Sequence, residues 1–235
     1  MANLPGPEPV TDIRDAATLI LIDRADGGFR VLMGRRHAGH KFMPGKFVFP
    51  GGALDPEDER MAVAGPLDEQ VAAKLLVHTR RRSQDYARAL ALAAIRETFE
   101  ETGLALGVTD CGAPPEPPAG VWARFAETGV FPTLEGLDLI ARAITPPGRP
   151  RRFDARFFVG DAQWIAHRGE GVIHAEAELT ELVWVPLDEA LTLEIPNITR
   201  MVLGHLAALG PGPWDRARPR PFYRMVRGKH VAETI

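Results

Sequence analysis

The sequence predicts an α/β (α+β) fold, a sandwich in which helices pack on strands. Short apolar runs of strand length occur along the chain together with longer segments of helical periodicity, and this mixture favours layered packing. The 235 residues, 45% of them hydrophobic and 25% charged, have an ordinary globular composition and suffice for one large core. We therefore expect one globular unit that contains both strands and helices.

The expected strands are short and lie between turn-forming residues. Residues 17–23 form an apolar run typical of a buried strand, and residues 29–33 are its expected hairpin partner across the turn at 26–28. A third strand covers residues 47–49 and stops at the P-G-G that follows it. The later expected strands are residues 153–159 and 182–185.

Helical spacing marks four further segments. The first covers residues 67–79, and the second begins near Ser83, a favourable N-cap residue, and ends at Gly103, a favourable C-terminal residue. Residues 111–120 are rich in proline and are expected to form a surface loop. The later expected helices are residues 187–191 and residues 197–209, the second of them capped by Asn197.

Bulk properties exclude several classes of function. The formal net charge of −3 and the sequence pI of 6.2 give no basic field for general nucleic-acid binding. A single cysteine, Cys111, excludes an intrachain disulfide and a cysteine-rich zinc site. No stretch approaches the roughly 18 consecutive apolar residues of a membrane span, and the polar N-terminus contains no signal-peptide core. We expect a cytoplasmic protein that binds neither nucleic acid nor membranes.

The most informative segment is the end of the second expected helix. Glu97, Glu100 and Glu101 lie on one side of this helix at its 3.6-residue periodicity. The opposite side, which can pack against a sheet, carries Leu92, Ile95 and Phe99. The helix is therefore apolar on one side and anionic on the other.

This arrangement of charge is unfavourable without a partner. Carboxylates three and four residues apart repel one another, and the last helical turn is the negative end of the helix dipole. Arg96 can pair with Glu100 four residues later, but one arginine does not balance three carboxylates. A hard cation such as Mg²⁺ would balance them and would keep coordination positions for a phosphate substrate. The alternative interpretation is a solvated acidic helix face.

Two segments together resemble the box of the Nudix hydrolases, a family of diphosphatases. The family pattern is G-x5-E-x7-R-E-U-x-E-E-x-G-U, in which U is apolar. Here F-P-G-G at residues 49–52 precedes a helix that ends in R-E-x-x-E-E-x-G-L at residues 96–104. The second half of the box carries the metal chemistry in the family, and it is complete except that Thr98 stands at an apolar position.

The first half of the box departs from the family spacing. Counted from the last glycine of F-P-G-G, the position of the first glutamate holds Asp58, with Glu57 and Glu59 alongside. Residues 59–95 then precede the arginine of the box, which makes 37 residues where the family has seven and hence an insertion of 30. A box split in this way is similar to the Nudix branch that includes acyl-coenzyme A diphosphatases.

A second segment points to the same branch. Coenzyme A-active Nudix enzymes carry a segment written roughly L-L-T-x-R-x4-R-x3-G-x3-F-P-G-G. The residues that match this spacing are Leu32, Arg36, Gly45 and residues 49–52. Lys41 stands in place of the second arginine, which keeps the charge and loses the bidentate geometry. Met33 and Gly34 replace the second leucine and the threonine, so the match is partial.

The resemblance implies a fold and a domain organisation. The implied fold is a three-layer α/β/α sandwich with a mixed sheet. It would form a single domain over residues 1–235, with a helical insertion at about 59–95 and a flexible N-terminus at about 1–14. The oligomeric state is left open, and a homodimer is one alternative.

The resemblance also implies a cofactor and residue roles. The cofactor would be Mg²⁺ or Mn²⁺, which would activate a water for attack on a phosphorus atom of a diphosphate. Glu97, Glu100 and Glu101 would be the metal ligands, and Arg96 would hold a box carboxylate in place. The implied substrate-binding residues are Arg36, Lys41, Gly51 and Gly52.

A further carboxylate precedes the strand expected at residues 182–185. Nudix enzymes often bring a metal ligand or general base from a loop at this place. We choose Glu178 for this role and keep Glu176 as the second candidate. The alternative is that both are solvated loop residues.

These features predict a diphosphatase that acts on a nucleoside diphosphate derivative, with coenzyme A or acyl-coenzyme A as the first candidate substrate. An ADP-ribose or dinucleotide diphosphatase is the second enzyme hypothesis, because loops outside the box set the substrate. A non-catalytic nucleotide-sensing module is the hypothesis from another class, because a fold does not fix a function. The complete set of Glu97, Glu100 and Glu101 argues against it, since a sensor has no need for a metal site.

Overall fold

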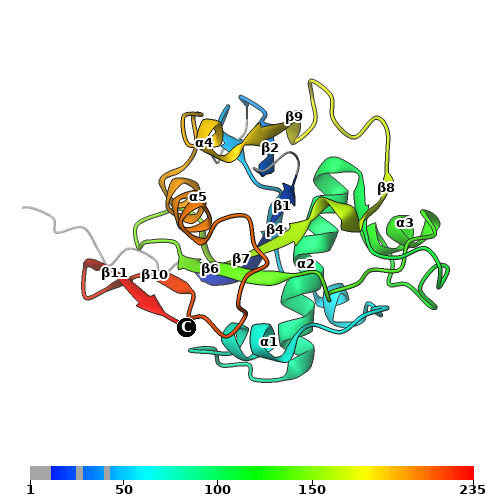
Figure 1. The fold of residues 1–235 in the computed structure, drawn as a ribbon, viewed down its shortest axis with the longest axis horizontal. Coiled ribbons are helices and arrows are strands. Elements are labelled where there is room, and N and C mark those ends of the chain that lie inside the picture. The colour runs from blue at the N-terminus through cyan, green and yellow to red at the C-terminus, as the bar shows by residue number, and fades with distance from the viewer. Residues whose placement is uncertain (1–11, 25–28, 40–42) are drawn as a thin grey trace, which may run out of the picture.

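The computed structural model describes residues 12–24, 29–39 and 43–235, which form a mixed sheet with helices on both faces (Figure 1). The strands are β1 (Ile13–Asp23), β2 (Arg30–Arg36), β3 (Phe47–Val48), β4 (Gly51–Ala53), β5 (Leu104–Leu106), β6 (Asp138–Ile144), β7 (Arg152–Asp161), β8 (Ile165–Arg168), β9 (Leu179–Pro186), β10 (Pro221–Val226) and β11 (Lys229–Thr234). The helices are η1 (Pro56–Glu59), α1 (Glu69–Leu75), α2 (Gln84–Thr102), α3 (Val121–Glu127), η2 (Ala162–Trp164), α4 (Leu187–Ala190) and α5 (Asn197–Leu209).

The large sheet has nine strands and mixed pairing. Its order is β11-β10-β6-β7-β1-β2-β3, with β4 paired to β1 and β9 paired to β2. β1 runs parallel to β7, and β10 runs parallel to β6, whereas the other pairs are antiparallel. β5 and β8 form a separate antiparallel pair. The predicted α/β class with a mixed sheet is confirmed.

The central strand β1 divides the core into two layers. Leu19 and Leu21 belong to the buried cluster that contains the apolar residues of α2, whereas Ile20 and Ile22 belong to the cluster that contains those of α5. Alternate residues of a strand point to opposite faces, so this apolar run requires cover on both sides. Burying such a side chain contributes about 1.5–3 kcal/mol. Figure 1 shows the resulting layers, with α5 on one side of the sheet and α2 on the other.

α2 is long because its sequence places a suitable capping residue at each end and gives the polar residue inside the helix a hydrogen-bond partner. The Ser83 hydroxyl accepts a hydrogen bond from the backbone N–H of Tyr86 at 3.2 Å and caps the first turn, as predicted. Gly103 ends the helix at a φ of 75°, where a side chain would be strained. Thr98 is fully buried and donates to the carbonyl of Ala94 at 2.8 Å, so its hydroxyl is satisfied at this apolar position.

Several element boundaries differ from the prediction. β1 begins at Ile13 and pairs there with β7, so residues 13 and 14 belong to a strand and not to a flexible N-terminus. The predicted cap at Asn197 is wrong, because Pro196 takes the N-cap position and Asn197 is the first helical residue, with no side-chain cap hydrogen bond. The turn predicted at 26–28 lies outside the described residues.

None of the segments expected from the sequence corresponds to β4, β5, β6, β8, β10, β11 or α3. The case of β6 has a clear physical reason. Arg142 interrupts its apolar run, but the side chain is buried because its guanidinium binds the carboxylate of Asp154 at 2.7 and 2.6 Å. A charged residue within an apolar strand is thus neutralised by a partner on the neighbouring strand β7.

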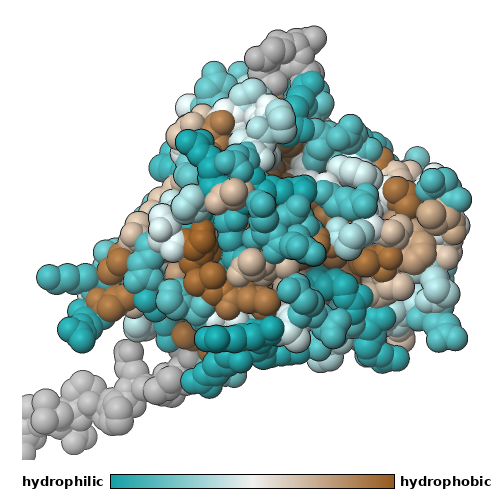
Figure 2. Space-filling model, turned by 60° about the horizontal axis from the view of Figure 1, so that its bottom comes forward, coloured by the Kyte–Doolittle hydropathy of each residue, from teal (hydrophilic) through white to brown (hydrophobic). Residues whose placement is uncertain are grey.

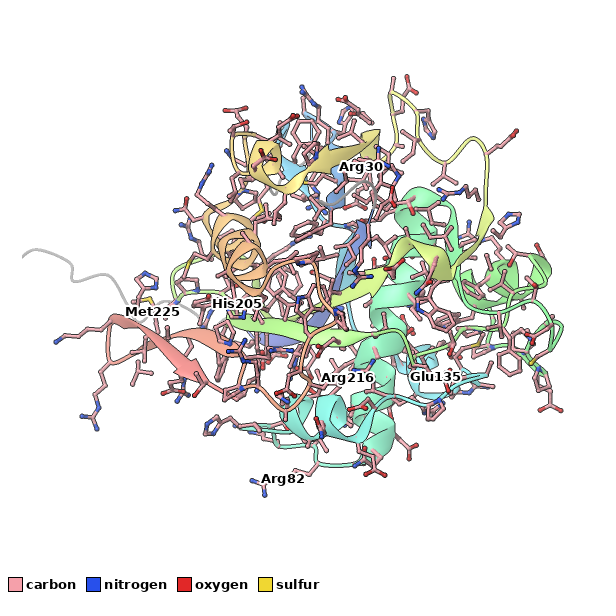
Figure 3. All side chains as sticks on the ribbon, viewed as in Figure 1. Arg30, Arg82, Glu135, His205, Arg216 and Met225 are labelled. Carbon is pink, nitrogen blue, oxygen red and sulfur yellow. The ribbon has the colours of Figure 1, made fainter. Side chains whose placement is uncertain are left out.

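The 59–95 segment lies at the lower side of the molecule in Figure 1 and contains α1 and the first part of α2. Arg81 forms an ion pair with Glu59 at 2.6 Å, and its guanidinium lies over the ring of Tyr86. Figure 3 shows Arg82 at the lower edge of the molecule, whereas Arg30 lies in its upper part. The segment also packs against the rest of the molecule, because Asp68 forms an ion pair with Arg216 at 3.0 Å and the carbonyl of Val77 accepts a hydrogen bond from Arg142.

The surface carries few large apolar side chains. On the face shown in Figure 2, hydrophobic residues form small patches that hydrophilic residues interrupt. The large hydrophobic residues that are exposed in the described part of the chain are Ile13 and Met201. None of the helices within the described ranges has the length and apolar character needed to cross a membrane.

Candidate functional site

Two glycines bring β4 into contact with the end of α2. The backbone N–H of Gly51 donates a hydrogen bond to a carboxylate oxygen of Glu101 at 3.2 Å. A Cβ added to Gly52 would lie 2.4 Å from Cδ of Glu97, and one added to Gly51 would lie 2.6 Å from the carbonyl oxygen of Ala17. A side chain at Gly51 would therefore collide with the backbone of β1, and one at Gly52 would displace the carboxylate of Glu97. Two predicted substrate-binding residues thus lie against two predicted metal ligands.

Asp58 is the buried anchor of the site. Its side chain is fully buried and accepts hydrogen bonds from Arg96 Nε at 2.7 Å and Arg96 Nη2 at 3.1 Å. The indole N–H of Trp122 and the backbone N–H of Asp55 each donate to the same carboxylate at 2.9 Å. A buried carboxylate that receives a bidentate guanidinium and two further donors is fully satisfied. Asp58, and neither of its glutamate neighbours, therefore lies opposite Arg96.

Arg96 also holds two of the predicted metal ligands. Its Nη1 donates to Glu97 at 2.8 Å and lies 3.6 Å from Glu100, which is the i,i+4 pair expected from the sequence. Its Nη2 donates to the carbonyl of Ala53 at 2.8 Å. Burial lowers the pKa of Arg96, but the bonds to Asp58 and the charge of Glu97 outweigh burial and raise that pKa above its ordinary value. The guanidinium is therefore permanently charged.

Glu101 is a buried carboxylate with weak compensation. It is 6% exposed, and its ion pair with Nη2 of Arg36 is long, at 3.8 Å. Burial raises the pKa of Glu101 well above its ordinary value, and the charge of Glu178 adds to the increase, while Arg36 opposes it. Burial also raises the pKa of Glu97, against the opposing charge of Arg96. Ionisation of either carboxylate therefore costs free energy in the folded protein.

The structure separates the two general-base candidates. Glu178 accepts a hydrogen bond from Nη2 of Arg36 at 2.7 Å, and the same guanidinium contacts Glu101. The side chain of Glu176 is 84% exposed, and its carboxylate lies 3.3 Å from Nδ1 of His174. Arg36 thus brings Glu178 to the carboxylates of α2 and leaves Glu176 in solvent.

Arginines occupy the space between these carboxylates. Within residues 12–24, 29–39 and 43–235, no group of three or more His, Cys, Asp or Glu side chains is arranged to hold a metal ion. Glu97 and Glu100 face Arg96, and Glu101 faces Arg36, so the acidic side of the helix is divided between two cations. The chemistry still fits a divalent cation, because the donors are carboxylate oxygens and two of them have raised pKa values.

Other predicted residues have different outcomes. Lys41 lies outside the described residues. Arg36 contacts two carboxylates, an arrangement that the spacing of the coenzyme A segment does not indicate. Trp122 is buried and donates a hydrogen bond to Asp58. The sequence does not predict this contact, because no local pattern joins a tryptophan to a carboxylate 64 positions away.

Comparisons with known proteins give a consistent result. No family profile matches this chain. The crystal structure of a NUDIX hydrolase from Alicyclobacillus acidocaldarius is similar, with 32% identity, a TM-score of 0.63 and coverage of 85% of this chain and 93% of that chain. The Caenorhabditis elegans protein named nudix hydrolase 7 is 27% identical over 187 residues, which are 76% of this chain and 53% of that protein. This chain therefore spans about half the length of that curated relative.

We expect Asp58→Asn to destabilise the fold by about 3 kcal/mol, because it leaves the buried guanidinium of Arg96 without its bidentate partner. Urea unfolding followed by circular dichroism measures the difference. Glu57→Gln is the matched control, since Glu57 pairs with the exposed Arg60 and its loss should change stability by less than about 0.5 kcal/mol. Equal stability of the two variants would contradict the role of the buried pair.

We expect Glu101→Gln to raise the melting temperature of the metal-free protein at neutral pH, because the amide avoids burial of a charge. The folded pKa of Glu101 is raised, so its ionisation weakens folding as the pH rises above the ordinary value of 4.5. The advantage of the variant should therefore shrink as the pH falls toward that value. Thermal melts in EDTA between pH 5 and pH 8 test this, with the exposed Glu127→Gln as control. A variant that melts below the wild type at every pH would refute it.

Proposed function

Because this chain belongs to the Nudix hydrolase superfamily, we propose that it hydrolyses the diphosphate bond of a nucleotide-containing small molecule. Nudix hydrolases act on phosphate anhydrides and generally use divalent metal ions. We assign Glu97, Glu100 and Glu101 as the metal ligands. We propose Mg²⁺ or Mn²⁺ as the ion. Oxygen donors on one helix, with room for water and phosphate, suit these ions.

The contact between α2 and the glycines of β4 carries this proposal. Gly51 and Gly52 admit the carboxylates of Glu101 and Glu97 against bare backbone, and the charge of Glu101 is poorly compensated there, since its pair with Arg36 is 3.8 Å long. A purely structural helix end has no need for costly carboxylates at such a place. A bound divalent cation would supply the positive charge that these carboxylates lack. The free-energy cost of burying them in the free protein would then be offset when the cation binds.

The bound metal would neutralise the diphosphate and make a water nucleophilic near neutral pH. The chain's own residues orient this chemistry. Arg96 fixes the end of α2 through Asp58 and thereby fixes the carboxylates that α2 carries. The water attacks one phosphorus atom, the bond from that phosphorus to the bridging oxygen breaks, and a proton of the water passes to a base. We assign this base to Glu178, whose Oε1 accepts from Arg36, so that Oε2 is the receiving oxygen.

Arg36 is our candidate for contact with the diphosphate. Its guanidinium lies between Glu101 and Glu178, at the edge where the scissile bond must approach the carboxylates. A guanidinium matches phosphate oxygens in a bidentate manner. We assign Gly51, Gly52 and Lys41 to substrate binding as well, the last from its place in the coenzyme A segment alone.

Coenzyme A or an acyl derivative is the substrate that we propose. The support is the spacing of Leu32, Arg36, Gly45 and residues 49–52 together with the insertion in the box. Hydrolysis would give 3′,5′-ADP and a 4′-phosphopantetheine product.

We expect millimolar Mg²⁺ or Mn²⁺ to raise the melting temperature of the wild type and to support turnover, because a ligand that binds only the folded state stabilises it. Glu100→Gln and Glu101→Gln should each remove most of the turnover while the fold persists, and Glu178→Gln should lower it. Release of phosphorylated product measures turnover. The control is Glu127→Gln, an exposed change that should leave turnover intact. Near wild-type turnover in either α2 variant would exclude that residue as an essential ligand.

We expect coenzyme A to be turned over faster than ADP-ribose or NADH at one metal concentration. The measurement is kcat/KM for coenzyme A, dephospho-coenzyme A, ADP-ribose and NADH, with products identified by chromatography. Much faster cleavage of ADP-ribose or NADH than of either coenzyme A form would refute the substrate assignment and would leave the diphosphatase proposal standing.

A further inference from the structure

We propose that Arg36 exchanges partners as the site fills: its guanidinium competes with the divalent cation for Glu101 and, once it has left Glu101, contacts a phosphate group of the substrate. This inference rests on the proposed function and adds an order of binding to it, the cation first and the phosphate second. A single nitrogen, Nη2 of Arg36, lies 2.7 Å from Oε1 of Glu178 and 3.8 Å from Oε1 of Glu101. One cationic group therefore serves two carboxylates, and one of these is an assigned metal ligand.

The backbone of Arg36 is fixed, so that only its side chain is available for this exchange. The pairing register between β2 and β9 shifts between Arg35 and Arg36, and an irregularity of this kind re-aims a side chain at the end of a strand. The backbone N–H of Arg36 donates to the carbonyl of Lys46 at 2.9 Å, and its carbonyl accepts from the N–H of Gly45 at 3.1 Å. The exchange is therefore a rotation of one side chain on a rigid strand.

Glu178 is the partner that Arg36 keeps. The backbone carbonyl of Glu178 accepts a hydrogen bond from the N–H of His37 at 3.0 Å, so its main chain is fixed beside the end of β2. The distance of 2.7 Å between Nη2 and Oε1 of Glu178 is that of a charge-assisted hydrogen bond. The side chain of Glu178 is 42% exposed, and solvent therefore shares in compensating its charge. Glu178 thus anchors the guanidinium at the edge of the carboxylates of α2.

Glu101 is the partner that Arg36 gives up. The side chain of Glu101 is 5% exposed, and its Oε2 accepts a hydrogen bond from the N–H of Gly51 at 3.2 Å. Its Oε1 faces Arg36 at 3.8 Å, which is beyond hydrogen-bond distance. A divalent cation carries twice the charge of a guanidinium, so a carboxylate at a given distance attracts it twice as strongly. Arg36 is therefore the weaker competitor for Oε1 of Glu101.

The exchange couples the binding of the cation to the binding of the phosphate. A guanidinium has five N–H donors in a planar fork, so Arg36 retains donors for phosphate oxygens while Glu178 holds one of its nitrogens. As long as the guanidinium faces Glu101, part of its charge is engaged by that carboxylate. Each ligand therefore favours the other through Arg36, which is a coupling free energy between two binding events.

The first test is the dissociation constant of Mn²⁺ for the full chain at pH 8, measured without substrate from the electron paramagnetic resonance of free Mn²⁺. Arg36→Gln should tighten Mn²⁺ binding roughly threefold to tenfold, because a competing ion pair is removed. The matched control is Arg35→Gln, which removes the same charge one residue earlier, where Arg35 pairs with Glu181 at 3.1 Å and is half exposed. The control should change the constant less than about twofold. Arg36→Met, which keeps the apolar stem, replaces the glutamine variant if that variant does not fold.

The second test is the affinity of α,β-methylene-ADP, a diphosphate analogue without a bridging oxygen, measured by calorimetry in EDTA and in saturating Mn²⁺. In Mn²⁺, Arg36→Gln should weaken the analogue roughly tenfold or more, as loss of a charge-assisted contact does. In EDTA the same change should alter the affinity less than about twofold, because Arg36 is then engaged by Glu101. Arg35→Gln should have neither effect.

Unchanged or weakened Mn²⁺ binding in Arg36→Gln would overturn the exchange, and so would an equal loss of the analogue in EDTA and in Mn²⁺, which is the result for a fixed positive charge. If the analogue does not bind measurably in EDTA, the Mn²⁺ constants decide alone. Either contradictory result would leave the proposed function standing if the wild type binds Mn²⁺ and cleaves a diphosphate. The expected pattern without cleavage of any diphosphate would retain the exchange and refute the enzyme, whereas a wild type that does not bind Mn²⁺ would refute both.

Discussion

The rest of the site depends on the buried pair of Asp58 and Arg96. The two residues are 38 positions apart, on opposite sides of the insertion, and their side chains meet in a fully buried network that Trp122 completes. Such a pair is demanding, because loss of either partner leaves an uncompensated charge in the core. It therefore fixes the end of α2 against the turn of η1.

The fixed helix end places carboxylates where their charge is unfavourable. Glu101 and Glu97 lie against glycine backbone, and burial raises the pKa of each. Arg96 and Arg36 moderate this cost without removing it. Under the function proposed above, this loss of stability in the free protein would be the counterpart of affinity toward a cation, a relation that is usual in enzymes.

The sequence predicts those parts of the site that have local signals. The periodicity of α2, its caps at Ser83 and Gly103, and the glycines of β4 all follow from neighbouring residues. The contacts of Arg36 with Glu178 and of Trp122 with Asp58 do not, because they join segments 142 and 64 positions apart. β6 was missed for a related reason, since the charge of Arg142 interrupts its apolar run and its partner Asp154 lies on another strand, β7. Contacts between distant segments thus determine these parts of the structure, and the local sequence pattern does not reveal them.

We propose that the raised pKa of Glu101, caused first by burial, reflects a site that binds a divalent cation. The most direct measurement is the number of protons released when Mn²⁺ binds, obtained by calorimetry in buffers of different ionisation enthalpy between pH 5 and pH 8. A cation binds the ionised carboxylate, so the wild type should release protons at low pH, and the release should decline as the pH rises. Glu101→Gln should abolish most of this release. Binding of Mn²⁺ without proton release at any pH, or release unchanged in the variant, would contradict the account.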